Sequence, residues 1–187
     1  MRRSTVIYLV LFAIVLGAAY YFNNRQKSAD LETPTETAAP IEYLFTSADG
    51  LPTRIRIASK AGDVVEVARN AENAWALILP EEAAADQGSV EAAATQVTTM
   101  RILERVPNLT PDVVGLDDPE YTMSLQFTSG VERNIEIGVI TPTGSGYYVR
   151  GEDNEIVIVS NSAVDSLLGL LTNLPFAPTE TPPPASP

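Results

Sequence analysis

The chain has 187 residues, of which 24 are acidic and 12 basic, and it contains neither cysteine nor histidine. A chain of this length is expected to form one folded domain. Without cysteine it has no disulfide, no thiolate metal site and no thiol nucleophile, and without histidine it lacks the commonest general base. Its net charge of −12 opposes binding to nucleic acid, because the phosphate backbone would be repelled.

The chain begins with an apolar segment that predicts one transmembrane helix. Ser4–Asn24 carries no charge, and at about 1.5 Å per residue it reaches ~31 Å, enough to cross a bilayer core of roughly 30 Å. Arg2 and Arg3 precede it and favour a cytoplasmic N-terminus. We therefore expect a retained membrane anchor over residues 1–28, with the rest of the chain outside the cytoplasm. The alternative is a signal peptide cleaved near Gly17–Ala19.

Segments rich in proline, threonine and glutamate flank the folded region. Residues 29–40 read ADLETPTETAAP and residues 177–187 read APTETPPPASP. Both have too few bulky apolar side chains to offset their ordering entropy by burial. We expect a linker over 29–40, a disordered tail over 177–187, and one folded domain over 41–176, which holds 20 of the 24 acids and 8 of the 12 bases.

Alternating polar and apolar residues predict half-buried strands within 41–176. Turn residues at Lys60–Asp63 and Thr128–Gly130 separate paired runs and predict hairpins. The strands are expected at Arg54–Ile57, Trp75–Leu79, Met123–Phe127, Ile135–Val139, Tyr147–Val149 and Ile156–Val159. Together they predict a mainly antiparallel sheet.

Two stretches have the period of an amphipathic helix. The first is Asp86–Glu104, with Asp86 or Ser89 as its N-cap and with an apolar face of Val90, Ala93, Val97 and Met100. The second is Ser162–Asn173, where Ser162 and Asp165 have capping-box spacing, and its apolar face consists of Val164, Leu167, Leu168 and Leu171. We therefore predict an α+β domain with two helices.

The two halves of the domain share an order of elements. A hairpin over 53–68 precedes the aromatic strand Trp75–Leu79 and a helix, and a hairpin over 121–139 precedes the aromatic strand Tyr147–Val149, another strand and a helix. This order is typical of a duplicated β-β-β-α unit, and chance repetition in a meander fold is the alternative.

A short motif lies between the halves. Val113–Tyr121 reads VVGLDDPEY. In it Gly115 permits a turn that a side chain would oppose, Leu116 is expected to insert into the core, and Asp118 before Pro119 is pushed to an extended conformation that leads into the next strand. We interpret the motif as structural.

This motif and the elements around it resemble a bacterial family whose domain is of unknown function, DUF4340. The resemblance covers roughly residues 53–171 and includes Trp75, Leu79-Pro80 and Tyr147–Val149. It implies an N-terminal membrane anchor followed by β-rich extracytoplasmic modules, and it implies no established activity. Some relatives are associated with auxiliary parts of ABC-type transporters of the gliding-motility kind, and many carry several modules on a longer chain.

Acidic clusters are the only abundant functional groups. They occur at Asp117, Asp118 and Glu120, and again at Glu152–Glu155. Carboxylates of this kind bind Ca²⁺ in some proteins, but neither segment matches a known calcium loop, so solvated acidic turns are the better interpretation. Paired carboxylates also hydrolyse glycosidic bonds, which requires a cleft that the sequence does not indicate.

Three other features have a structural interpretation. Thr141–Gly146 lacks the Lys-Ser/Thr of a phosphate-binding loop and is expected to be a hairpin loop. Lys60 is the only lysine in the folded region, and its place in a turn predicts a surface residue. Trp75, Tyr147 and Tyr148 lie on predicted strands, where core packing explains at least one of each pair of facing positions, and an aromatic ring left on an outer face could serve a protein partner or a glycan.

The sequence thus assigns no catalytic, cofactor-binding or metal-binding residue and favours a protein that is not an enzyme. We expect a single-pass membrane protein with an extracytoplasmic interaction or accessory module, whose partners are the membrane and an envelope or transporter protein but not nucleic acid. The alternatives are a stalk-displayed module that binds a ligand or glycan, and a small carboxylate-dependent hydrolase.

Overall fold

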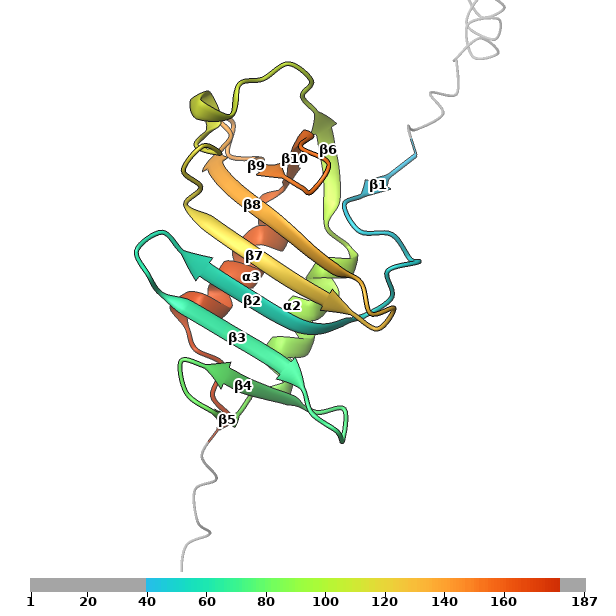
Figure 1. Ribbon diagram of the computed structural model, residues 1–187, viewed down its shortest axis with the longest axis vertical. Helices are drawn as coiled ribbons and strands as arrows, with labels where there is room; N and C mark the ends of the chain where they lie inside the picture. The colour runs from blue at the N-terminus through green and yellow to red at the C-terminus, as the bar shows by residue number, and fades with distance from the viewer. Residues whose placement is uncertain (1–39, 179–187) are drawn as a thin grey trace, which may run out of the picture. The chain divides into compact units, whose positions relative to one another are not determined.

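The computed structural model describes residues 40–178. In this range a ten-stranded antiparallel sheet carries α2 (Gln87–Thr98) and α3 (Asn161–Thr172), and a 3-10 turn, η1, covers Pro111–Val114 (Figure 1). The predicted α+β architecture, with an antiparallel sheet and two helices, is confirmed. The strands are β1 (Glu42–Tyr43), β2 (Pro52–Ser59), β3 (Val64–Arg69), β4 (Trp75–Leu79), β5 (Ala83–Ala84), β6 (Arg101–Arg105), β7 (Tyr121–Phe127), β8 (Glu132–Ile140), β9 (Gly146–Arg150) and β10 (Ile156–Ser160).

The sheet is organised around its central pair, β2 and β7. Its order is β1-β6-β10-β9-β8-β7-β2-β3-β4-β5, so β2 to β5 run outward in one direction and β7 to β10 in the other. Each run is followed by a helix, and α2 and α3 pack against each other. The repeated order of elements is therefore real in the fold. After α2 the chain crosses to the second half as β6, and after α3 it returns to the first half, where Phe176 forms a single antiparallel bridge with Ala85. A duplication as its origin stays a prediction.

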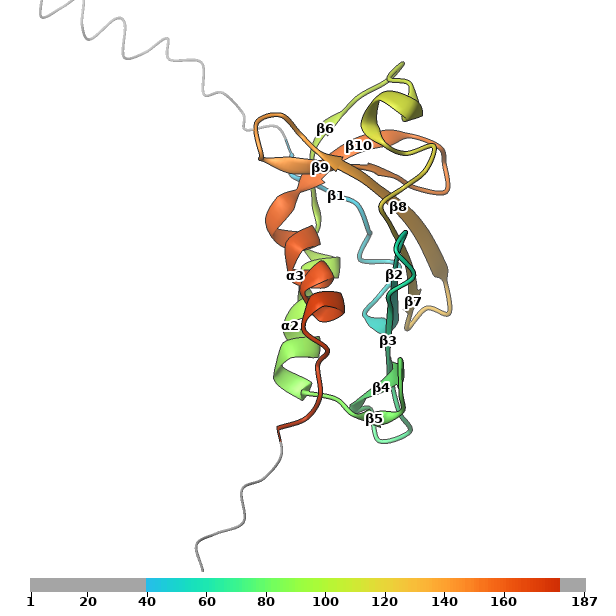
Figure 2. The same cartoon turned by 90° about the vertical axis from the view of Figure 1, so that its left-hand side faces the viewer.

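Alternation along the central strands divides the sheet into two faces. Ile55 and Ile57 on β2 are buried, as are Met123 and Leu125 on β7, with at most 1% of each side chain exposed. Figure 2 shows both helices on one side of the sheet, which is the side these residues cover. The other face is polar, and there Glu66 on β3 pairs with two arginines of β2.

The predicted helix over Asp86–Glu104 is too long. Asp86 caps α2 as predicted, with its carboxylate accepting from Ser89 N at 2.9 Å, but the helix ends at Thr98. Arg101–Arg105 forms β6 instead and pairs with β10. The reason is non-local: the backbone of these residues bonds to a strand about fifty positions later, and the threonine-rich end of α2 offers little helix propensity to resist it.

The capping box predicted at Ser162 and Asp165 does not form. Ser160 is the N-cap of α3, its side chain makes no capping bond, and its hydroxyl lies 2.9 Å from that of Ser162. Asp165 Oδ1 accepts from Tyr147 Oη at 2.9 Å instead. The buried face of α3 consists of Ala163, Val164, Leu167 and Leu170, whereas Leu168 and Leu171 are only half-buried.

The predicted anchor over residues 1–28 lies outside the described residues, as do the linker up to residue 39 and the tail from residue 179. Within residues 40–178, no helix is long and apolar enough to cross a membrane.

Candidate functional site

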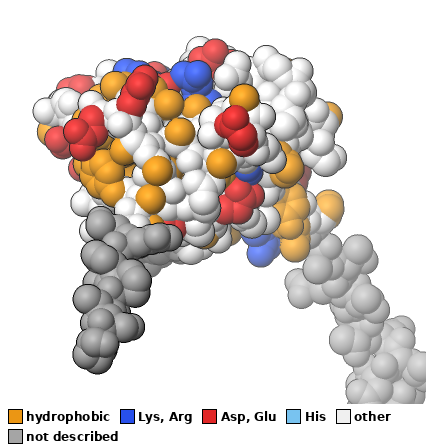
Figure 3. Space-filling model, turned by 90° about the horizontal axis from the view of Figure 1, so that it is seen from below, with side chains coloured by type: hydrophobic (Ala, Val, Ile, Leu, Met, Phe, Trp, Pro, Cys, Tyr) orange, Lys and Arg blue, Asp and Glu red, His pale blue; other side chains and the backbone are white. Residues whose placement is uncertain are grey.

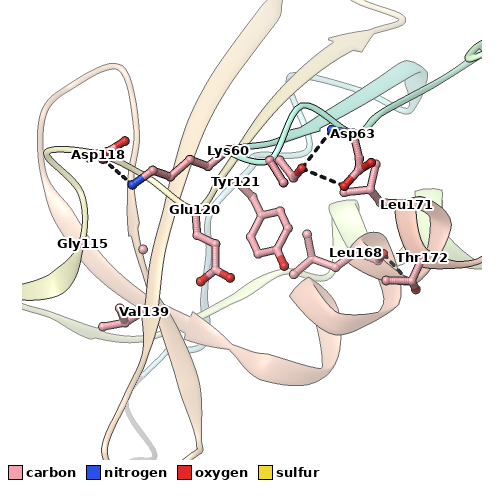
Figure 4. A pocket seen from close by; sticks show the side chains of 13 residues that line it. Lys60, Asp63, Gly115, Asp118, Glu120, Tyr121, Val139, Leu168, Leu171 and Thr172 are labelled. Carbon is pink, nitrogen blue, oxygen red and sulfur yellow. Dashed lines mark hydrogen bonds and ion pairs between the residues drawn. The ribbon is translucent and has the colours of Figure 1, made fainter.

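A groove of about 900 Å³ opens between the turn that joins β2 to β3, the motif loop before β7, and α3 (Figure 4). Three separate parts of the chain supply most of the lining residues, which are Ser59, Lys60, Ala61 and Asp63, then Gly115, Asp118, Glu120 and Tyr121, and then Leu168, Leu171 and Thr172. Gly138 and Val139 near the end of β8 complete it. The volume lies within the range of about 300–1,000 Å³ that ligand sites in proteins occupy.

The first wall is the β2–β3 turn. Gly62 has a φ of +100°, which a residue with a side chain rarely adopts, and it lets the chain reverse direction. Ser59 N donates to Asp63 O at 2.8 Å and closes the turn. Lys60 N donates to Glu120 O at 2.8 Å, so the backbone of the turn is fixed directly to the motif loop.

The motif loop forms the second wall, and Gly115 and Leu116 have the turn and the burial that the sequence predicts, although Leu116 is buried outside the main core. Gly115 is left-handed, with a φ of +70°, and ends the 3-10 turn. Leu116 is fully buried with Val114 and Ile156 in a small cluster apart from the main core. Its carbonyl accepts from Arg150 Nη2 at 2.6 Å. The buried Leu116 side chain and the bond from Arg150 thus fix the loop to the domain, while Gly115 and Asp118 face the groove.

Apolar side chains form the third wall. Leu168 and Leu171 of α3 pack against the main core on one side and line the groove on the other. Val139 on β8 lines it as well and is 44% exposed. Tyr121, at the start of β7, contributes an aromatic ring (Figure 4). These apolar side chains already face the groove in the folded domain, so a bound molecule can contact them without a conformational change.

The charged side chains of the groove are one lysine and three carboxylates. Lys60 pairs with Asp118, and both side chains are largely exposed, at 59% and 72%. Asp63 is bound only locally, to Ser59. Among residues 40–178, neither Asp63 nor Glu120 takes part in an ion pair. Figure 4 shows Asp118 and Asp63 at opposite ends of the groove, with Glu120 between them.

The negative charge here acts on a neighbouring tyrosine. Burial, as the largest cause, raises the pKa of Tyr147 to about 12, together with the hydrogen bond to Asp165 and the charge of that residue. Tyr121 and Glu120, which line the groove, contribute smaller effects in the same direction. The negative charge of the groove itself follows from its lining, which holds three carboxylates and one lysine.

The acidic residues that the sequence singled out are only partly brought together. Asp118 and Glu120 line the groove, and Asp117 does not. In the second acidic segment, Glu152 pairs with Arg133 at 3.5 Å and Glu155 pairs with Arg105, so these carboxylates balance local bases. Within the described part of the chain, no three acidic side chains are grouped to hold a metal ion.

The remaining candidates have structural roles. Trp75 is 2% exposed, donates to Glu91 Oε2 at 2.7 Å and stacks under Arg69 at 4.4 Å. Tyr148 is half-buried against the Leu116 cluster. The segment Thr141–Gly146 joins β8 to β9 and is a hairpin loop as predicted.

The groove itself was missed by reasoning from the sequence. Its three walls lie far apart along the chain, and no local period indicates that they meet. One signal was present: the apolar stripe of α3 includes Leu168 and Leu171 in addition to the residues that fill the core.

The fold places the protein among α+β domains built on a single antiparallel sheet. The family described as "Domain of unknown function (DUF4340)" matches residues 75–174. The chain belongs to this family, and the match confirms the resemblance inferred from the motif. The matched region contains every groove residue from Gly115 onward, while Ser59–Asp63 precedes it. No curated protein and no solved structure was found to match the chain.

Proposed function

We propose that the protein is a non-catalytic interaction module of an envelope assembly, held at the membrane by residues 1–28 with its domain outside the cytoplasm. The observation that carries this proposal is the groove, which combines a preformed apolar wall with carboxylates spread along its length. An accessory role beside a transporter is part of the proposal and rests on the resemblance to relatives of that kind.

The arrangement of carboxylates favours contact over catalysis. Hydrolysis of a glycosidic bond needs two carboxyl groups about 5–9.5 Å apart on either side of the bond. Here Asp118 is paired with Lys60, and Asp63 lies at the other end of the groove (Figure 4). Glu120 is exposed to solvent, and it does not lie opposite a second carboxylate in an enclosed cleft. Binding a protein partner does not require two carboxyl groups to be placed on either side of one bond, as catalysis does.

A small ligand or a glycan is the second candidate occupant. The volume of the groove suits such a molecule, and Tyr121 supplies an aromatic ring of the kind on which sugars stack. Both candidates would occupy the same groove. A crosslinking experiment from the groove separates them, because only a protein partner would be captured as a protein.

A photo-crosslinking amino acid at Thr172 tests the proposal. Thr172 is exposed and lines the groove, whereas Ala71 is exposed in the turn between β3 and β4 and serves as the control position. The full chain carrying either label is expressed in its native cells and irradiated. We expect a stoichiometric membrane protein to be captured from Thr172 and not from Ala71. Equal capture from both positions, or from neither, would overturn the proposal.

A further inference from the structure

We propose that the groove binds a basic, amphipathic segment of a protein partner, with lysine or arginine side chains on Asp63 and Glu120 and apolar side chains against Leu168, Leu171 and Val139. This inference rests on the proposed function, because it names the chemistry of the partner that the same groove receives.

The charges of the groove select a cation. Lys60 neutralises Asp118, which leaves Asp63 and Glu120 without an ion pair among the described residues. Lys60 is the only basic residue that lines the groove, and the folded region as a whole carries 20 acids against 8 bases. An approaching basic segment is attracted at long range and orientated by the two carboxylates on contact.

The apolar wall selects a segment that also carries apolar side chains. Leu168 and Leu171 keep part of their surface in the groove, and Val139 is 44% exposed there. Burying such side chains against a partner contributes about 25 cal/mol for each Å² of apolar surface removed from water. A purely hydrophilic cation would leave this wall in water, so it would gain only the electrostatic part.

The geometry favours a chain over a compact cation. The carboxylates are distributed along the groove and do not converge on one point (Figure 4). Hydrophobic and acidic side chains are also interspersed elsewhere on the domain, as Figure 3 shows for the face of the molecule seen from below. A polypeptide that alternates basic and apolar side chains matches such a distribution, whereas a single metal ion does not.

Charge also excludes the main competing occupants. Nucleic acid and an anionic membrane surface would be repelled by the carboxylates of the groove. A second copy of the chain would bring another domain with the same excess of acids, and the two domains would repel each other. A different, basic protein is the occupant that this domain attracts.

The absence of cysteine allows a site-specific test with the full chain purified in detergent. A fluorophore on Thr172→Cys reports binding in the groove, and the same fluorophore on Ala71→Cys is the control. Three synthetic peptides of equal length are titrated: one of leucine and lysine, one of leucine and glutamate, and one of serine and lysine. We expect the leucine–lysine peptide to bind at least about tenfold more tightly than the others, with a response from Thr172 only.

Charge reversal identifies the carboxylates involved. The double variant Asp63→Lys, Glu120→Lys is expected to bind the leucine–lysine peptide at least about tenfold more weakly, because two attractive contacts become repulsive. The matched control is Glu81→Lys, Glu82→Lys, which changes the net charge equally at exposed positions outside the groove. The control should bind within about twofold of the parent chain. Equal weakening in both variants, or equal binding of all three peptides, would show that the groove does not select a basic segment.

The two proposals fail in distinguishable ways. If crosslinking from Thr172 captures a membrane protein through an acidic or uncharged segment, the proposed function stands and this inference is wrong. If the captured segment is basic and apolar, both are supported. If neither the label at Thr172 nor the label at Ala71 captures a protein, the proposed function itself is wrong, whatever the result of the peptide titrations.

Discussion

The hydroxyl of Tyr147 on β9 donates a hydrogen bond of 2.9 Å to the carboxylate of Asp165 on α3. The bond ties the last helix to the sheet close to the groove. Asp165 does not cap its own helix, because the helix begins with Ser160 as its N-cap and Asp165 lies beyond the capping position; its carboxylate bonds to the strand instead. The carboxylate that the sequence pattern assigned to a helix cap makes a tertiary contact instead.

Replacing Tyr147 by phenylalanine should remove a pH dependence at high pH. The folded-state pKa of Tyr147, about 12, lies above the usual value near 10. Its stabilising effect is therefore complete below about pH 10 and is lost as the pH rises through about 12. The pKa shift corresponds to roughly 3 kcal/mol, which solvent screening at this partly exposed hydroxyl reduces to about 1 kcal/mol. Urea unfolding between about pH 9 and 12 should show this loss in the parent chain and in Tyr148→Phe, but not in Tyr147→Phe.

Asp49 should govern stability at acid pH. It is 5% exposed, accepts from Thr46 N and Oγ1 at 2.8 Å each, and accepts from Arg133 at 2.9 Å. The bonds from Thr46, foremost, and from Arg133 hold the pKa of Asp49 below its usual value. Its contribution is present above about pH 4 and is lost as the pH falls through the lower folded-state pKa. Asp49→Asn should lower the free energy of unfolding by about 1–2 kcal/mol at pH 7, and that free energy should fall less steeply as the pH is lowered below about 4. Asp112 is exposed and serves as the control, and Asp112→Asn should change neither the stability at pH 7 nor its dependence on acid pH, as measured by urea unfolding.

The strands were predictable because their burial repeats locally. In β2, Ile55 and Ile57 face the helices and Arg54 and Arg56 face solvent, and this two-residue period is already visible in the sequence. The motif loop was predictable for a related reason, since a left-handed glycine and a buried leucine are properties of single positions. Where one residue and its neighbours decide the conformation, the sequence is sufficient.

The errors share one cause, which is competition from distant residues. Met100 fits the helical period of α2 and is fully buried, yet the chain beyond it forms β6, because β10 supplies hydrogen-bond partners there. Leu168 and Leu171 fit the apolar stripe of α3 but line the groove, because Leu167 and Leu170 face the core and α2. The groove unites segments that are far apart along the chain, Ser59–Asp63, the motif loop and the end of α3, so no local pattern contains it.

The proposed anchor predicts where the protein fractionates. Full-length chain should sediment with membranes and resist extraction at high pH, because Ser4–Asn24 gains roughly 3–6 kcal/mol on insertion from its ten Val, Ile, Leu and Phe residues. Two charges introduced as Leu11→Lys and Ile14→Lys should release it, since each costs about 3 kcal/mol at the centre of a bilayer. N-terminal sequencing of the parent chain gives the complementary result: a new terminus near Tyr20 in a soluble fraction would mean that the segment is a cleaved signal peptide.

Leu116 should be the main apolar support of the motif loop. Its side chain is fully buried with Val114 and Ile156, so Leu116→Ala should lower the free energy of unfolding by about 2–5 kcal/mol. Two residues before Gly115, Val113 is 68% exposed, and Val113→Ala should change stability by less than about 0.5 kcal/mol. Chemical denaturation of both variants measures the difference. A cost below about 1 kcal/mol for Leu116→Ala would mean that the loop is held by its backbone bonds alone.

Two glycines should respond in opposite directions to the same substitution. A Cβ atom at Gly138 on β8 would collide with the carbonyl oxygen of Val114, where the strand runs directly beneath the motif loop. Because backbone must move to relieve the clash, Gly138→Ala should cost about 3 kcal/mol or more and widen the groove at this wall. Gly169 lies inside α3 with no atom within 4 Å of its Cβ position, so Gly169→Ala should stabilise the protein by about 0.5–1 kcal/mol through helix propensity. Thermal unfolding of the two variants gives both signs, and a neutral Gly138→Ala would show that the loop and β8 are not in close contact.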